Sequence, residues 1–399
     1  MNGSYTIYKR DPDGTQGDMI PDFTKLEIKL SWGRNAKISL TGVSRTGETV
    51  LEPGDGLTIF RNGNYFLGVI IDEVQTECTD PSTGVKYWVA EGDEDTVLLS
   101  RRQVLADPVD LTFDKDTYDK ADDYAYNRII HYIYNSAYRG TTRNRWLADE
   151  LTLPSERPVG TEGVSAYRSI SLNRALNEIG KEDDLFPVLT INPKTGAYTV
   201  TIPEPRDKTE EIIISPEFGN VTKWKRTDKA PQFNAVWVVS GDYSQGRLYV
   251  YAEDLESIAK YGRIETVVSR SDVKVWEDGG EETEEESEEE HLTEEDVTAI
   301  LEEEARTQLI EHGVKRSWSV SVIETKDLAF MDDWQVGDYV TCAIDGEKFE
   351  TQITEASIVY EEGAEVVEPT VGTIERGLFG QLLDLIDGLD DRITRKENE

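Results

Sequence analysis

Two distant segments of the chain share one hairpin pattern, and this internal repeat constrains the fold more than any other feature. GDGLTIFRNGNYFLGVI at 54–70 aligns without a gap with GDYVTCAIDGEKFETQI at 337–353, at a constant offset of 283 residues. Six of the seventeen positions are identical, and the apolar residues alternate in phase. A period this long excludes a solenoid. It predicts two related β domains separated by other material.

The shared pattern has a simple physical basis. Gly-Asp opens a tight turn into a strand, and the second glycine, Gly63 or Gly346, lies in a hairpin loop where positive φ is required. A phenylalanine, Phe66 or Phe349, then anchors the return strand. Any hairpin with a glycine turn shares part of this pattern, so chance similarity is the alternative to duplication.

The first copy lies in a region of further strands. Leu26, Ile28, Leu30 and Trp32 alternate with polar residues, which indicates a strand with one buried face and one solvent-exposed face. Turn signals at 51–55, 61–64 and 81–84 separate the strands that follow. Residues 1–105 therefore read as an all-β domain.

Helical periodicity replaces the alternation after this region. The sequence predicts a helix at 121–137 and a second at 163–182, whose apolar stripe includes Leu172, Leu176 and Ile179. FPVLTINPKTGAYTVTI at 186–202 reads as a hairpin. Helices followed by a hairpin predict a small α+β domain over 106–214.

The second β domain is predicted to be discontinuous, built from 215–245 with 316–372. Residues 246–315 read as an insertion. The insertion holds the run 277–290, with nine Glu and one Asp in fourteen residues, which repels itself and is expected to form a disordered loop. A helix should follow from the N-cap Thr293, with Asp296 at its third position, and end at Gly313.

The segment 373–399 is predicted to form an amphipathic helix. Its apolar residues follow spacings of three and four, which suits either a trimeric coiled coil, a docking site for a tip protein, or packing on the chain itself. The candidate oligomer or partner contacts are Leu378, Leu382, Leu385, Leu389 and Ile393.

Composition restricts the function classes. A net charge of −38 in 399 residues repels nucleic acid and anionic lipid, so sequence-specific nucleic-acid binding is not expected. No apolar run reaches the ~18 residues of a membrane span. The N-terminus lacks a signal-peptide core, so we expect folding in a cytoplasm. The two cysteines, Cys78 and Cys342, are too few and too distant for a disulfide scaffold, a zinc site or a redox motif.

No residue set carries recognisable chemistry, so we expect no catalytic residue, no cofactor and no metal. His131, His291 and His312 each lack a second ligand at metal spacing. Asp11, Asp13, Gly14 and Asp18 show only a fragment of a calcium loop. A tyrosine cluster is either a platform for sugars or core packing, and comprises Tyr118, Tyr124, Tyr126, Tyr132, Tyr134 and Tyr138.

Several short motifs, in this order, resemble the tail hub family of long-tailed phages (siphophages), the baseplate hub or tail-associated proteins that close the tail tube. PGD-x-L-x-I…G-x-x-F-x-G-x-I at 53–70 resembles their first tube domain, and Glu91-Gly92-Asp93 with Leu98–Arg102 resembles its end. Later landmarks are Arg206-Asp207, YGRIE at 261–265, Val336-Gly-Asp338 and EVVEPTVG at 365–372. The resemblance spans about residues 20–372.

The resemblance implies a mainly β fold with α+β parts, in which two tube-type β-barrels flank the α+β domain. Three chains with two barrels each would match a six-fold tail tube on one side and a three-fold tip on the other. It also implies partners: a distal tail protein or tube ring, the tape measure protein, and tip or receptor-binding proteins. The chain would reside in the virion at the tail tip, where an acidic lumen would let DNA leave without adhering.

Two other functions remain open at this point. A tail-associated hydrolase of the cell wall is one, although many relatives carry that activity in a C-terminal extension that this chain of 399 residues lacks. An adhesin for carbohydrates or a receptor, resting on the tyrosine cluster, is the other.

Overall fold

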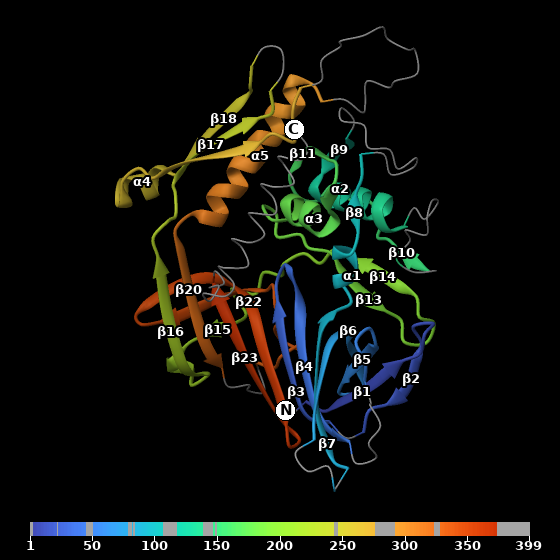
Figure 1. Ribbon diagram of the computed structural model, residues 1–399. Helices are drawn as coiled ribbons and strands as arrows, with labels where there is room; N and C mark the ends of the chain where they lie inside the picture. The colour runs from blue at the N-terminus through green and yellow to red at the C-terminus, as the bar shows by residue number, and fades with distance from the viewer. Residues whose placement is uncertain are drawn as a thin grey trace.

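The protein is built mainly of strands, as expected, and most of them join in one 13-stranded sheet (Figure 1). The computed structural model describes residues 3–21, 23–44, 51–78, 82, 84–106, 118–138, 147, 150–242, 246–275, 292–322 and 328–372. The acidic run 277–290, His291 and the predicted helix at 373–399, with its five candidate contact residues, lie outside this described part.

The N-terminal region supplies seven strands to the large sheet, in the order β3-β4-β7-β6-β5-β1-β2. Each pairs antiparallel with its neighbour. Their bounds are Tyr5–Arg10 (β1), Gln16–Met19 (β2), Phe23–Ser31 (β3), Arg34–Ser44 (β4), Gly56–Arg61 (β5), Asn64–Glu77 (β6) and Lys86–Glu94 (β7).

The C-terminal region repeats this order with six strands, β16-β20-β23-β22-β21-β15. Four of its five pairings are antiparallel like their counterparts, and only β15 runs parallel to its neighbour where β1 runs antiparallel. The bounds are Ile213–Ile214 (β15), Val221–Lys229 (β16), Lys315–Val322 (β20), Tyr339–Ile344 (β21), Glu347–Glu361 (β22) and Ala364–Gly372 (β23). The same order of six strands supports duplication over chance.

The repeated hairpins agree in position. The offset of 283 residues maps β5 onto β21 end to end, and the first residue of β6 onto the first of β22. Both turns take the left-handed backbone that their sequences favour, with φ of 53° and 78° at Asn62-Gly63 and 56° and 77° at Asp345-Gly346. The first copy has one irregularity that the second lacks, a bulge between Ile59 and Phe60.

The two repeats are fused through one seam. The second half of β22 pairs antiparallel with β3, so that Ile358 lies opposite Ile28. Buried residues of both repeats then form a single apolar cluster, from Tyr5 to Val371. Within the described residues no strand pairing closes either repeat into a barrel, so the expectation of two separate barrels is corrected to two repeats of one open sheet.

The region between the repeats has its own apolar cluster. The predicted helix at 163–182 is shorter than expected: Leu172–Gly180 (α3) is helical, whereas Glu162–Tyr167 (β11) is a strand paired with Asp119–Tyr124 (β9). Ser169 at φ 54° separates the two elements, and Ser171 caps the helix. The hairpin is present as Val188–Ile191 (β13) and Tyr198–Thr201 (β14). The other elements are Val97–Ser100 (α1), Gln103–Val104 (β8), Ala125–Ile133 (α2), a π-helical turn at Tyr134–Tyr138, Leu151–Thr152 (β10) and Ile170–Ser171 (β12).

The insertion interrupts one hairpin of the second repeat. In the first repeat, the two residues Trp32-Gly33 connect β3 to β4. In the second repeat, β16 ends at Lys229 and β20 begins at its partner Lys315, and the insertion connects these two residues. Ala235–Ser240 (β17), expected in the second β domain, pairs instead with Tyr249–Glu253 (β18) and Glu265–Arg270 (β19).

Helices complete the insertion. The predicted helix is present as Glu294–His312 (α5), with the Thr293–Asp296 capping box. Its apolar residues form a third cluster with β17 and with Ala166 of β11. The shorter helix Leu255–Tyr261 (α4) lies at one end of the inserted sheet (Figure 1).

Candidate functional site

One face of the large sheet is lined with polar side chains, and we call it the polar face. Alternation places Lys25, Glu27 and Lys29 of β3 on this face, while Leu26 and Ile28 point into the core. Cross-strand registers extend the face in rows, such as Ser357–Lys29–Lys37–Asp93 and Val359–Glu27–Ser39–Glu91. The face therefore runs across the seam between the repeats.

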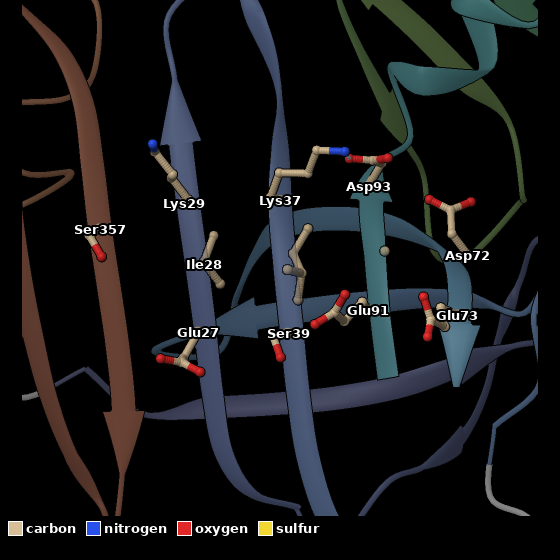
Figure 2. Close-up of a pocket in the computed structure, with 12 residues that line it drawn as sticks. Glu27, Ile28, Lys29, Lys37, Ser39, Asp72, Glu73, Glu91, Asp93 and Ser357 are labelled. Atoms are coloured by element: carbon tan, nitrogen blue, oxygen red, sulfur yellow. Dashed lines mark ion pairs between the residues drawn. The ribbon is translucent and has the colours of Figure 1, made fainter. Parts of the chain in front are cut away.

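The polar face holds an open depression of about 460 Å³ over β22, β3, β4, β7 and β6. Figure 2 shows its side chains rising from these neighbouring strands. Its charged lining comprises five carboxylates and two lysines: Glu27, Asp72, Glu73, Glu91, Asp93, Lys29 and Lys37. The excess of carboxylates makes this part of the face anionic.

Ion pairs along the depression neutralise part of its negative charge. Lys37 Nζ lies 2.5 Å from Asp93 Oδ1, and Lys29 Nζ lies 3.0 Å from Glu355 Oε1. Burial, followed by the neighbouring Asp93 carboxyl, raises the pKa of Asp72 above its ordinary value. Like charges held this close make the depression a better host for cations than for phosphates.

The second repeat gives the same face a different charge. Lys223 and Lys225 of β16 lie opposite Ser321 and Ser319, on the side away from the buried Val320. The expectation of an acidic surface therefore fits the carboxylates of β6 and β7, whereas β3, β4 and β16 present lysines on this face.

The Gly-Asp turns of the repeat differ in how deeply their carboxylates are buried. Asp55 accepts the N–H of Glu52 at 2.7 Å and pairs with Lys9 at the same distance. Asp338 is fully buried, accepts the N–H of Gln335 at 2.7 Å, and receives both Nε and Nη2 of Arg206 at 2.7 and 2.6 Å. The same turn therefore carries more charge-assisted bonds in the second repeat.

We expect Asp338→Ala to lower the free energy of unfolding by about 2–3 kcal/mol, because a charge-assisted contact of ~1.5–3 kcal/mol is lost and the N–H of Gln335 remains unsatisfied. The matched change Asp55→Ala should cost about 1 kcal/mol, since solvent reaches that pair. Denaturant unfolding of both variants measures the difference. Equal losses would contradict the contrast in burial.

The two described histidines that were considered as metal ligands, His131 and His312, lie in different surroundings. His131 Nε2 lies 2.7 Å from Asp119 Oδ1, and Asn135 also donates to this carboxylate at 3.0 Å. His312 stacks on Phe233 with ring centroids 4.7 Å apart. Asp11, Asp13 and their neighbours form the turn between β1 and β2. In the described part of the chain, no three His, Cys, Asp or Glu side chains gather as metal ligands.

The tyrosine cluster divides into core and surface. Tyr118, Tyr126 and Tyr132 are buried, and the hydroxyl oxygen of Tyr132 lies 2.9 and 2.8 Å from the backbone carbonyl oxygens of Asp119 and Ser165. Tyr134 and Tyr138 are exposed and stack on each other with centroids 5.2 Å apart. The packing alternative therefore accounts for the buried members, and an aromatic platform would reduce to one pair.

Sequence reasoning missed the polar face as a site. The sequence did contain a signal for it, because the charged residues Lys25, Glu27 and Lys29 alternate with apolar residues along one predicted strand and must therefore share its other face. The pairing of β3 with a strand 330 positions away had no signal in the sequence. None of the helices that the structure describes has the length and apolar character that crossing a bilayer requires.

Comparison with known families gives one match. The family described as Siphovirus ReqiPepy6 Gp37-like protein matches residues 15–373, which includes both repeats and everything between them. No protein of curated function matches the sequence.

Solved structures share the fold at low sequence identity. A 43 kDa tail protein of prophage MuSo2 from Shewanella oneidensis is 11% identical, with a TM-score of 0.56 over 92% of this chain and 97% of its own. A tail protein from Neisseria meningitidis MC58 is 12% identical, with a TM-score of 0.55 and coverages of 93% and 97%. Prophage tail protein gp18 from Listeria monocytogenes EGD-e is 11% identical, with a TM-score of 0.51 and coverages of 96% and 99%.

Proposed function

Because the chain belongs to the Siphovirus ReqiPepy6 Gp37-like family, we propose that it is a structural protein of a phage tail, and more specifically the trimeric hub at the distal end of the tail tube. The fold, which it shares over nearly its whole length with three tail proteins, two of them from prophages, supports the general assignment. The expected resemblance to siphophage tail proteins is thus confirmed at the level of the family.

The observation that carries the trimer is the duplication inside one sheet. Each chain holds two repeats with the same order of six strands, joined edge to edge by β22 and β3. Three such chains present six repeats, so a trimer can meet a six-fold ring without a change of fold. A chain with one repeat could do so only as a hexamer.

In this proposal the polar face lines the central channel of the trimeric ring. The region between the repeats and the insertion of the second repeat face the tip of the tail. The hub would connect the tube, through a distal tail protein or tube ring, to tip or receptor-binding proteins, and it would meet the tape measure protein from inside. The carboxylates of β3, β6 and β7 would keep DNA from adhering as it leaves, because phosphates are repelled. No catalytic step is part of the proposal.

The experiment is a mass measurement of the purified full chain, followed by imaging of assembled tails. We expect a species of three times the chain mass, and density for three chains at the end of the tail tube. A monomer at every concentration together with absence from tails would overturn the proposal. Presence in tails with another copy number would overturn the trimer alone.

A further inference from the structure

We propose that the insertion of the second repeat binds a short neutral oligosaccharide on the open side of its three-stranded sheet. We call this surface the aromatic face, and it comprises Trp237, Tyr249, Tyr251 and Val267. The site goes beyond the proposed hub and does not depend on the trimer, since it lies within one chain.

The inserted sheet is covered on one side only. Val236 and Val238 of its central strand β17 are buried, and they belong to the apolar cluster that includes α5. Figure 1 shows α5 alongside β17. Because successive side chains of a strand point to opposite faces, Trp237 points away from this cluster. Trp237, Tyr249 and Val267 are all exposed there, and a contiguous exposed apolar patch indicates a binding surface.

The strand register brings the aromatic side chains together. Trp237 lies opposite Tyr251 of β18 and opposite Val267 of β19, in one row across the sheet. The ring centroids of Trp237 and Tyr251 are 4.5 Å apart, and those of Trp237 and Tyr249 are 5.7 Å apart. The three rings therefore form one aromatic surface, which Val267 extends on the other edge.

A polar cluster borders the aromatic face at one end. Arg263 donates from Nη2 to Glu253 Oε2 at 2.6 Å and from Nη1 to Glu265 Oε1 at 3.1 Å. The hydroxyl of Tyr251 contacts both Glu253 and Arg263, so these charge-assisted bonds also hold the Tyr251 ring. In the described part of the chain Glu253 makes its contacts through Oε2, which leaves Oε1 to accept a hydroxyl of a ligand.

The chemistry of the aromatic face limits the class of ligand. The negative face of an aromatic ring attracts the C–H groups on the flat side of a sugar ring. Nucleic-acid bases also stack on aromatic side chains, but the net charge of −38 repels their phosphates. The carboxylates of Glu253 and Glu265 outnumber the single guanidinium of Arg263, which likewise disfavours an anionic sugar.

The size of the aromatic face decides between a sugar and a protein partner. The three strands have five or six residues each. With ~3.3 Å per residue and ~4.8 Å between strands, they offer a face of roughly 200 Å². A stable protein interface takes about 800 Å² from each partner. The face is therefore too small for a protein partner, whereas it fits a short oligosaccharide.

Stacking favours sugars whose hydroxyl groups are equatorial, such as glucose and N-acetylglucosamine. Their ring hydrogens are axial, so both sides of each ring are apolar and can lie on an aromatic side chain. The hydroxyls then point outward around the ring, where Arg263 and Glu253 can reach them. Cellotriose and triacetylchitotriose are neutral oligosaccharides of this type, and they serve as the probes.

The test is calorimetric titration of the full chain with each of the two probes. We expect Trp237→Ala and Tyr249→Ala each to weaken binding of a probe by about tenfold or more, because each variant loses a stacking ring. Tyr249 is 65% exposed, so its replacement should leave the fold intact. The matched control is Phe218→Ala, which removes an equally exposed ring directly before β16 and should leave binding unchanged.

Binding that is lost in Tyr249→Ala and kept in Phe218→Ala supports the site. Binding of neither probe, or binding that Tyr249→Ala retains, would overturn it. Loss of binding only in Tyr134→Ala with Tyr138→Ala would overturn it as well, because the sugar would then lie on that stacked pair in the middle region. A Trp237→Ala variant with a lower mass in solution would show that a second copy covers the aromatic face instead. The proposed hub stands in each case, since the copy number in tails is measured separately.

Discussion

Replacing Asp95 with alanine should lower the free energy of unfolding by about 3–5 kcal/mol, because it leaves a buried arginine without its counter-charge. Both oxygens of Asp95 accept from Arg10, at 2.9 Å from Nη1 and 2.6 Å from Nη2. The Asp95 side chain is 0% exposed and that of Arg10 is 4% exposed. Arg10 also donates to the hydroxyl of Tyr198 at 2.9 Å and to the carbonyl of Val69.

Two glycines make room for this pair. A Cβ on Gly68 would lie 2.1 Å from Asp95 Oδ2, and a Cβ on Gly56 would lie 2.5 Å from Arg10 Nε. Tyr198 belongs to β14 of the middle region, whereas Arg10 ends β1 of the sheet. The loss should therefore affect the packing of the middle region on the first repeat as well as the sheet itself.

The control for Asp95→Ala has the same bonding and different burial. Asp242 accepts Nε and Nη2 of Arg247 at 2.5 and 3.0 Å, but the two side chains are 75% and 43% exposed. Asp242→Ala should lower the free energy of unfolding far less than Asp95→Ala, because solvent screens an exposed ion pair. Denaturant titration followed by tryptophan fluorescence measures both variants. A loss at Asp95 no larger than at Asp242 would contradict the role assigned to burial.

The sequence predicts those parts of the fold that are decided locally. The hairpin turns at Asn62-Gly63 and Asp345-Gly346 depend on residues that tolerate positive φ, so the repeat could be placed to the residue. The capping box of Thr293 and Asp296 likewise fixed the start of α5. In each case neighbouring residues determine the conformation, and no distant strand is needed.

Long-range pairing explains what the sequence did not predict. The predicted helix at 163–182 starts too early, because β9 offers Val164 and Ala166 an antiparallel partner and α5 covers them from the insertion. β17 has the composition of a barrel strand, and only its pairing with β18 and β19 assigns it to the insertion. The polar face follows from alternation in single strands, whereas its continuity across the repeats requires the seam between β22 and β3.

A second large loss of stability is expected at the seam, for the variant Ile358→Ala. Ile358 of β22 and Ile28 of β3 are opposed and buried, and they join the cores of the two repeats. Removing the side chain should lower the free energy of unfolding by about 2–5 kcal/mol, as for other buried isoleucines. Val366→Ala, on the exposed side of the adjacent strand β23, should change it by about 0.5 kcal/mol or less.

A double variant shows whether the two repeats stabilise each other through this contact. If Ile28 and Ile358 pack against each other, the combined loss in Ile28→Ala with Ile358→Ala should differ from the sum of the single losses by about 0.5–3 kcal/mol. Losses that add within about 0.5 kcal/mol would mean that each isoleucine packs only within its own repeat.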